Sequence, residues 1–334
     1  FVPAAAGRMS ATVHAIARTL PLPAGAGLAR TLVERNMRAF RHAWLVLVSG
    51  FFEPVFYLFS LGVGLGALVG DIETTTGQLV EYAVFVAPAL MASAAMNGAV
   101  YDATFNVFFK LRYAKLYNSV LATPLGPRDV AVGEISWALL RGLFYSVAFL
   151  LVAVVAGVVT SWWAILAIPA ASLIGFAFAA VGMAATTFMR SWQDFNYVQL
   201  AILPMFLFST TFYPLSTSPE SCQWVVQVTP LYQGVELVRG LMLGDIGADL
   251  LVHVSYLIVM GLLGWPAIAP NGVIFGAQGD ARHRFNRGDR MRAGGAPSLR
   301  FAWKVATAGG LAGAAGYVLR DLPVVSALVA TGLF

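Results

Sequence analysis

The chain of 334 residues carries few charges. Asp, Glu, Lys and Arg make up 11% of it, whereas a soluble globular domain carries about 25%. Hydrophobic residues make up 59%, and the mean hydropathy is +0.75. A disordered protein, a nucleic-acid-binding domain and an ordinary cytosolic enzyme are excluded, because each needs a more polar chain. The apolar residues form long unbroken runs, which indicates an all-α, polytopic membrane protein.

Cysteine and nucleotide-binding motifs are scarce too. Cys222 stands alone, so no disulfide can form within the chain. No G-x-x-x-x-G-K-[ST] phosphate loop is present, and GVGLG at residues 62–66 lies inside an apolar run rather than after a strand. The first 26 residues lack the apolar core of a signal peptide, so we expect no cleaved leader. Metal-ligand spacings and Ser-His-Asp sets are missing, and we expect neither a bound cofactor nor enzyme chemistry on this chain.

Six apolar runs are long enough to cross a bilayer, which takes about 20 residues each. They cover residues 43–68, 82–100, 135–159, 162–188, 197–215 and 250–269. The third and fourth runs are only two residues apart, which predicts a tight hairpin. The sequence therefore predicts six transmembrane helices.

Basic residues are concentrated in alternate loops. The segments before residue 43, between 101 and 134, and after 269 are rich in Lys and Arg. The loop at residues 71–81 has acids and no base, and the loop at 216–249 has four acids and a single base, Arg239. By the positive-inside rule the basic segments face the cytoplasm, so both ends of the chain are predicted to be cytoplasmic.

Residues 28–44 show the pattern of an amphipathic helix. Leu32, Val33, Met37, Phe40 and Trp44 fall on one face at helical spacing, and charged residues occupy the other. A basic amphipathic helix directly before a membrane span indicates a helix that lies in the cytoplasmic interface. The alternative is a cytoplasmic extension of the first span.

Two loops are too long to be simple connections. In the loop at 102–134, residues 105–121 mix aromatic and basic side chains and are predicted to be helical, which would suit a docking element for a separate motor; the alternative is a structured loop. In the loop at 216–249, residues 220–229 and 231–243 read as short helices that re-enter the outer leaflet.

The order of these elements resembles the membrane subunit of type-2 ABC exporters. Local segments are similar to the lipooligosaccharide (nodulation-factor) exporter permeases and their actinobacterial drug-efflux relatives, and the resemblance covers residues 28–268. The segments are FFEPVFYLFSLGVGLG at 51–66, YAVFVAPALMASAAM at 82–96, KLRYAKLYNSVLATPL at 110–125 followed by Gly133-Glu134, ILPMFLFSTTFYPL at 202–215 and VELVRGLMLG at 235–244.

The resemblance implies a permease that works as a dimer of like or related chains in the bacterial inner membrane. Two cytoplasmic ATPase subunits would bind ATP and Mg²⁺, and membrane lipids, but no nucleic acid, would be further partners. The helix at 105–121 would transmit the motion of the ATPases. The candidate coupling residues are Lys110, Arg112, Lys115, Tyr117 and Glu134. Equally, Glu134 could be an interface anchor, and the bases could bind lipid headgroups.

Two charged residues lie inside predicted spans. Glu53 and Arg141 are each ~10–15 Å from the cytoplasmic end at 1.5 Å per residue. Charges at such a depth are costly unless they are paired, so we expect an ion pair or a shared polar cluster, which either locks the helices together or acts in transport.

The resemblance also places the second and fifth spans along the dimer interface and the export route. The candidate substrate contacts are Met91, Met96, Asn97, Met205, Phe208 and Thr211. Flexible Met and flat aromatic side chains suit a bulky amphiphile. Ordinary helix packing would account for the same residues.

We therefore expect a cytoplasmic extension at residues 1–27, an exporter membrane domain at 28–269 and an appendage at 270–334, which departs from the family. The appendage is expected to stay cytoplasmic, although a seventh span is an alternative.

The sequence does not decide between hydrophobic drugs and glycolipids as the exported substrate. An ion-coupled secondary transporter would show inverted repeats and paired intramembrane carboxylates, and a lipid-modifying membrane enzyme would show acidic or His clusters at one face; we find none of these.

Overall fold

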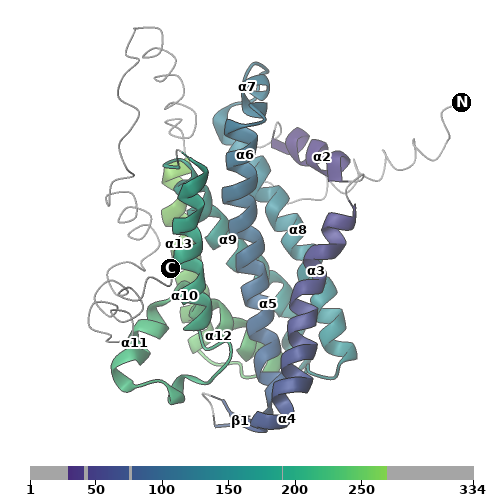
Figure 1. Ribbon diagram of the computed structural model, residues 1–334, viewed down its shortest axis with the longest axis vertical. Helices are drawn as coiled ribbons and strands as arrows, with labels where there is room; N and C mark the ends of the chain where they lie inside the picture. The colour runs from purple at the N-terminus through teal and green to yellow at the C-terminus, as the bar shows by residue number, and fades with distance from the viewer. Residues whose placement is uncertain (1–28, 41–43, 75–76, 190, 269–334) are drawn as a thin grey trace, which may run out of the picture.

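The computed structural model describes residues 29–40, 44–74, 77–189 and 191–268. The predicted flanking segments, residues 1–27 and 270–334, lie outside the described residues. Long helices run side by side along the molecule (Figure 1). They are α3 (Trp44–Phe59), α5 (Tyr82–Tyr101), α8 (Pro127–Val155), α9 (Ala167–Thr186), α10 (Phe195–Leu207) and α13 (Asp249–Ile268).

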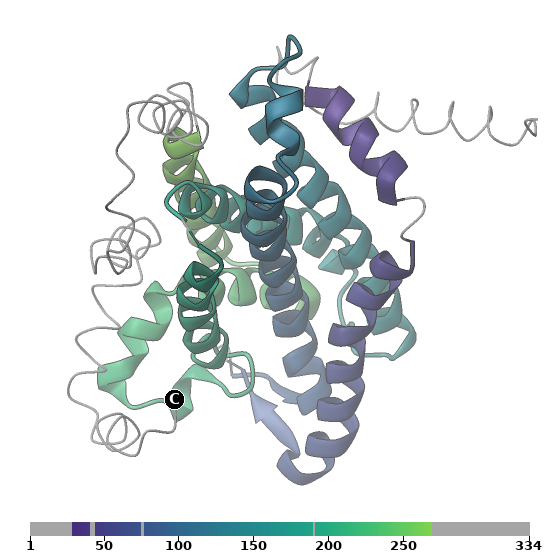
Figure 2. The ribbon, with the colours of Figure 1, turned by 45° about the horizontal axis from the view of Figure 1, so that its top comes forward.

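The two ends of the bundle carry different short elements. One end, called here the α7 end, holds α2 (Ala29–Phe40), α6 (Val107–Arg112) and α7 (Leu116–Val120). The opposite end, called the β1 end, holds the antiparallel pair β1 (Asp71–Glu73) and β2 (Leu79–Glu81) next to α4 (Gly66–Val69). Figure 2 shows α2 at the α7 end, lying at an angle to the long helices.

Four helices are long and apolar enough to cross a membrane. They are Phe52–Val69, Tyr82–Arg112, Arg128–Val155 and Trp162–Thr186, and a shorter apolar helix covers Asp249–Gly264. The first of them runs from α3 through η1 (Ser60–Leu65) into α4, and the fourth starts with η3 (Trp162–Leu166). These helices confirm a mostly helical membrane protein and four of the six predicted spans, and α13 matches the sixth run.

The fifth predicted span, residues 197–215, is not one helix. The α10 helix ends at Leu207, and η5 (Leu215–Thr217) follows an irregular stretch. Thr210 has a φ of 57°, a left-handed conformation that a β-branched residue rarely adopts. The hydroxyls of this stretch bond to nearby carbonyls, Ser209 to Phe206 O at 3.1 Å and Thr210 to Ser209 O at 2.6 Å, which competes with helical hydrogen bonding.

The second span is longer than predicted. It continues past Val100 through a π-helical turn, η2 (Asp102–Asn106), into α6. The predicted helix at 105–121 is therefore wrong as a separate element. Its first half completes this span, and the chain then turns at Lys115, whose φ is 48°, into the short α7. The apolar run ends at Val100, but the helix does not, because the polar residues that follow find partners inside the protein.

The predicted short helices at 220–229 and 231–243 are confirmed as α11 (Glu220–Val228) and α12 (Pro230–Leu243). The α12 helix is almost wholly buried. Glycines allow close approach around it: a Cβ on Gly234 would lie 3.0 Å from Ile174 Cδ1 on α9, and a Cβ on Gly240 would lie 2.9 Å from Leu250 Cδ2 on α13. The α12 helix is thus firmly seated against the bundle.

Candidate functional site

A buried carboxylate at the α7 end joins four helices. Glu134 on α8 is 5% exposed. Its Oε2 lies 2.6 Å from Lys110 Nζ on α6 and accepts a 3.3 Å hydrogen bond from Asn36 Nδ2 on α2. Its Oε1 accepts a 3.0 Å hydrogen bond from the Tyr117 hydroxyl on α7. A buried carboxylate needs such partners to offset its lost hydration. We call these four residues the Glu134 hub.

The start of α8 explains where Glu134 sits. Pro127 opens the helix eight residues before the predicted span, because its missing N–H costs nothing there. The Asp129 carboxylate accepts the Gly126 N–H at 2.9 Å and satisfies the first turn. This added length places Glu134 two turns inside α8, level with Lys110.

The neighbouring Gly133 brings α2 into contact. A Cβ at Gly133 would lie 2.9 Å from Leu32 Cβ and 3.1 Å from the Ala29 carbonyl oxygen. Leu32 and Asn36 are one turn apart on α2, so the crossing at Gly133 delivers Asn36 to Glu134. The predicted helix in this segment is confirmed, and its apolar residues Leu32 and Val33 are buried against the protein.

Tyr117 remains a hydrogen-bond donor over the physiological range. Burial raises the pKa of its hydroxyl well above the ordinary value, and the negative charge of Glu134 and their hydrogen bond raise the pKa further. The short α7 helix is otherwise exposed at Asn118 and Ser119. A displacement of α7 would therefore reach Glu134 through Tyr117.

A second charge pair lies deeper on the same helices. Arg141 Nη2 on α8 lies 2.5 Å from Asp102 Oδ1 in η2, and both side chains are less than a tenth exposed. Asn106 Nδ2 donates to the same Asp102 oxygen at 2.5 Å. The predicted partner Glu53 has an exposed side chain, so the ion pair formed by Arg141 is with a different acid. The sequence reading placed Asp102 in a loop, which hid it.

The two pairs have opposite polarity along the helices. Asp102 and Lys110 lie on the continuous α5–α6 helix, and Arg141 and Glu134 lie on the antiparallel α8. A slip of α8 by two turns would bring Glu134 next to Asp102, and the like charges would repel. The pairs therefore specify the register between the two helices.

An aromatic cluster connects the α7 end to α10. The ring of Phe105 lies 4.9 Å from Trp192 in η4 (Trp192–Asp194) and 5.5 Å from Phe195 in α10. Phe108 contacts Phe195 edge-on at 5.3 Å, and Tyr113 contacts Trp192 at 5.9 Å. This cluster was not predicted from the sequence, although the aromatic residues one turn apart at 105 and 108 indicate a shared face.

The remaining predicted site residues are spread over the molecule. Arg112 and Lys115 are exposed beside α7. Of the six candidate substrate contacts, Asn97 and Phe208 are exposed, and the others are packed inside the chain. The six therefore do not form one open surface in the single chain. The buried ones are Met91, Met96, Met205 and Thr211. Within the described ranges no group of three or more His, Cys, Asp or Glu residues could hold a metal ion.

Comparison with known proteins identifies the family of this chain. Residues 28–243 match the family model described as ABC-2 type transporter. The chain belongs to the ABC-2 transporter family. It is therefore the membrane permease subunit of an ABC exporter, a transport protein rather than an enzyme, and it lies in the bacterial inner membrane. The Glu134 hub lies inside the matched region of this permease.

Curated relatives of this ABC-2 permease include nodulation proteins. It is 32% identical over 241 residues to nodulation protein J of Rhizobium leguminosarum bv. viciae, which covers 71% of this chain and 91% of that protein. The protein of the same name from Sinorhizobium fredii is 32% identical over 69% of this chain and 87% of its own length. That of Bradyrhizobium diazoefficiens is 31% identical over 72% and 91%.

Proposed function

We propose that this permease exports lipooligosaccharides or similar amphiphiles with two copies of an ABC ATPase docked on its α7 end. The single observation that carries the proposal is the Glu134 hub, which ties the protruding α7 to three other helices. A motor that moved α7 would thereby move α2, α6 and α8 together. ATP and Mg²⁺ would bind to the ATPase partner.

The α7 end faces the cytoplasm in this proposal, as does the N-terminus. The bases Lys110, Arg112 and Lys115 lie at this end, whereas the acids Asp71 and Glu73 lie at the β1 end. This distribution follows the positive-inside rule. In the same arrangement α10 with its following segment and α13 would complete six crossings, and the C-terminus would return to the cytoplasmic side.

A second permease chain, like or related, would cover α10. Among the side chains of this helix only Met205 is buried, and Leu200 and Leu203 are 68% and 59% exposed. Phe208, directly after the helix, is 53% exposed. A dimer contact or the substrate's acyl chain would remove this apolar face from lipid and place Phe208 and Asn97 along the export route.

The substrate class follows from similarity. The chain resembles lipooligosaccharide exporter permeases in several segments and matches the three nodulation proteins named above over at least 87% of their length. Hydrophobic drugs are the second candidate, because the sequence segments also resemble those of actinobacterial drug-efflux permeases. An ion-coupled transporter is not favoured by the family membership.

Co-purification from the native host tests the proposal. The tagged full chain is extracted in mild detergent, and an ATPase with a Walker motif is sought by mass spectrometry. Charging the exposed face of α7 by Asn118→Glu with Ser119→Glu is expected to abolish ATPase recovery. The matched control, Ser221→Glu with Gln227→Glu on the exposed face of α11, is expected to leave it unchanged. Recovery of a folded permease without any ATPase would contradict the proposal.

The recovered complex then separates the substrates. ATPase activity is measured in lipid nanodiscs with added lipooligosaccharide or with a panel of hydrophobic drugs. Stimulation by the lipooligosaccharide alone supports the proposed substrate class, and stimulation by the drugs alone assigns the permease to drug efflux.

A further inference from the structure

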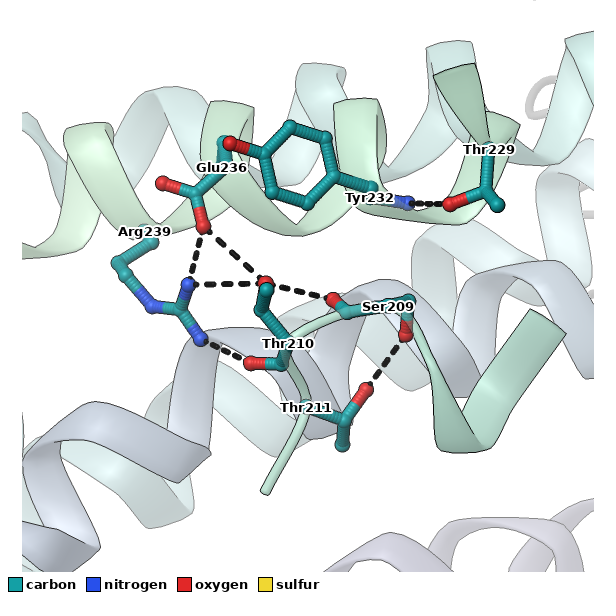
Figure 3. A network of polar contacts seen from close by, with 7 residues as sticks. All are labelled: Ser209, Thr210, Thr211, Thr229, Tyr232, Glu236 and Arg239. Atoms are coloured by element: carbon teal, nitrogen blue, oxygen red, sulfur yellow. Dashed lines mark hydrogen bonds and ion pairs between the residues drawn. The ribbon is translucent and has the colours of Figure 1, made fainter. Parts of the chain in front are cut away.

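A polar cluster at the β1 end joins two sequence segments that the coupling site does not use. Thr210 lies in the break after α10, within the segment at 202–215, and Glu236 and Arg239 lie on α12, within the segment at 235–244. Figure 3 shows the Arg239 guanidinium pointing from α12 at Thr210, with Glu236 beside it. We call these three residues the clasp.

Arg239 holds Thr210 by its main chain and its side chain. Its Nη2 donates to the Thr210 carbonyl at 2.8 Å, and its Nη1 lies 3.5 Å from the Thr210 hydroxyl and pairs with Glu236. The Thr210 hydroxyl in turn lies 3.3 Å from Glu236 Oε1. These contacts stabilise the left-handed backbone of Thr210, which a free Thr would rarely adopt.

The clasp also covers the first turn of α5. The Arg239 guanidinium carbon lies 4.0 Å from the centre of the Phe85 ring, a cation–π contact. The neighbouring Tyr82 hydroxyl donates to the Phe212 carbonyl at 3.4 Å. The same helix reaches Lys110 of the Glu134 hub at its other end, so one continuous helix connects the hub to the clasp.

The clasp fastens a loosely packed element to a firmly seated one. The α12 helix is fixed by close contacts at Gly234 and Gly240, whereas α10 buries only Met205 along its length. Within one chain, the end of α10 at the β1 end is therefore less firmly held than α12.

Opening the clasp would not strand a charge. Glu236 and Arg239 are three residues apart on α12, so they stay paired when Thr210 leaves. The contacts of Thr210 with Arg239 and Glu236 are lost, as is the hydrogen bond from Tyr82 to the Phe212 carbonyl. In the described part of the chain Arg239 Nε is buried without a hydrogen-bond partner, so the closed state does not use every donor of the guanidinium. The charge pair on α12 therefore does not oppose the release of Thr210.

We propose that Arg239 is a positioning residue that closes the outer side of the permease by fastening Thr210 to α12, and that Arg239 must release Thr210 for the substrate to leave. The outer location of the clasp rests on the proposed function, which places the β1 end on the side of the membrane away from the cytoplasm. Opening would let the end of α10 swing away from α5 and uncover Thr211, which is fully buried in the structure.

Cysteine labelling on intact cells tests the clasp without any ATPase. The full chain carries Cys222→Ser, and Thr211→Cys is the reporter for a membrane-impermeant maleimide. Ser216→Cys, at an exposed position after the break, is the positive control. Arg239→Gln is expected to speed labelling of Thr211→Cys about tenfold or more, because bonds to a charged donor are lost, and to leave Ser216→Cys unchanged. Arg128→Gln, an exposed Arg at the other end, is the matched control and is expected to change neither rate.

The outcomes separate the two proposals. Slow labelling of Thr211→Cys that rises with Arg239→Gln but not with Arg128→Gln supports the clasp. Equal rates with and without Arg239, or labelling of Thr211→Cys as fast as Ser216→Cys while Arg239 is present, would overturn it. Labelling of Ser216→Cys only after permeabilisation would overturn the outer placement and with it the proposed orientation.

A conservative variant covers the case in which Arg239→Gln does not fold. Arg239→Lys keeps the positive charge beside Glu236 but lacks the second nitrogen that binds the Thr210 carbonyl. It is expected to give an intermediate labelling rate of Thr211→Cys. A rate equal to that with Arg239 present would contradict the role of the second guanidinium nitrogen.

Once an ATPase is recovered, trapping the complex with ATP is expected to speed labelling of Thr211→Cys. An unchanged rate would show that the clasp does not open in the transport cycle.

Discussion

The Tyr117 hydroxyl on α7 donates a 3.0 Å hydrogen bond to Glu134 Oε1 on α8, a residue 17 positions along the chain. Tyr117 is 1% exposed and Glu134 is 5% exposed. This bond directly links the tip of the α7 end to the long helix behind it. The proposed coupling of an ATPase to α8 runs through that hydrogen bond.

Removing this one donor is expected to weaken the link without breaking the hub. Tyr117→Phe keeps the ring packed and leaves Lys110 and Asn36 on the carboxylate. The free energy of unfolding in detergent should therefore fall by about 1–2 kcal/mol. Substrate-stimulated ATPase activity of the complex should fall more than ATPase recovery does. Tyr113→Phe, on an exposed ring near the same tip, is the control and should shift stability by less than about 0.5 kcal/mol. Equal effects of the two variants would contradict a special role for Tyr117.

The Lys110–Glu134 ion pair is expected to show strong coupling in a double-mutant cycle. Glu134→Gln leaves the Lys110 ammonium facing a neutral amide, and Lys110→Met leaves the carboxylate with two neutral donors. Each single variant should lower the free energy of unfolding by about 1–3 kcal/mol. This is less than for a fully buried pair, because Lys110 is about a fifth exposed and solvent partly screens its charge. The double variant should be more stable than the sum of the two losses implies. Thermal unfolding of the purified permease measures all three, and strict additivity would count against the pair.

Two substitutions test whether Asp102 or Glu53 is the partner of Arg141. Asp102→Asn leaves Arg141 as a buried cation without its counter-ion, so the loss should be about 3–5 kcal/mol, visible as reduced yield of folded protein. Glu53→Gln, the change at the partner predicted from the sequence, should cause no such loss, because that side chain is exposed within the span and a neutral amide costs less in lipid than a carboxylate. The exchange Asp102→Arg with Arg141→Asp should recover part of the yield. A larger loss from Glu53→Gln than from Asp102→Asn would reverse the assignment.

Two glycines of α8 test the crossing of α2. Gly142 has open space around the position of a Cβ, so Gly142→Ala should stabilise the helix by up to about 1 kcal/mol through helix propensity. Gly133→Ala gains the same propensity but places a methyl group 2.9 Å from Leu32 Cβ, so it should push α2 away and destabilise the protein. Limited proteolysis before residue 44 compares the two variants. Identical protection in both would show that α2 does not depend on Gly133.

The sequence by itself determined the class of protein and most of its helices. Long apolar runs separated by alternately basic loops indicate a chain that crosses a membrane several times. In lipid the backbone groups must bond to one another, so each run is expected to form a helix. Two short helices near the end, α11 and α12, were also predictable, since Pro219 and Pro230 mark their starts. The candidate coupling residues Lys110, Tyr117 and Glu134 were named from the resemblance to type-2 ABC exporters, without their mutual contacts.

Only the tertiary structure decided where helices end and which charges meet. The apolar run stops at Val100, yet the helix continues to Arg112, because Arg141 and Glu134 of another helix neutralise Asp102 and Lys110. The two pairs join residues that are 24 and 39 positions apart in the chain. The periodicity of a sequence reports only on nearby residues, so it cannot predict such pairs. The break at Thr210 is likewise stable because Arg239 of α12 binds its carbonyl. Local patterns report which residues prefer to be buried, whereas the partner that makes a buried charge tolerable is set by how the helices pack.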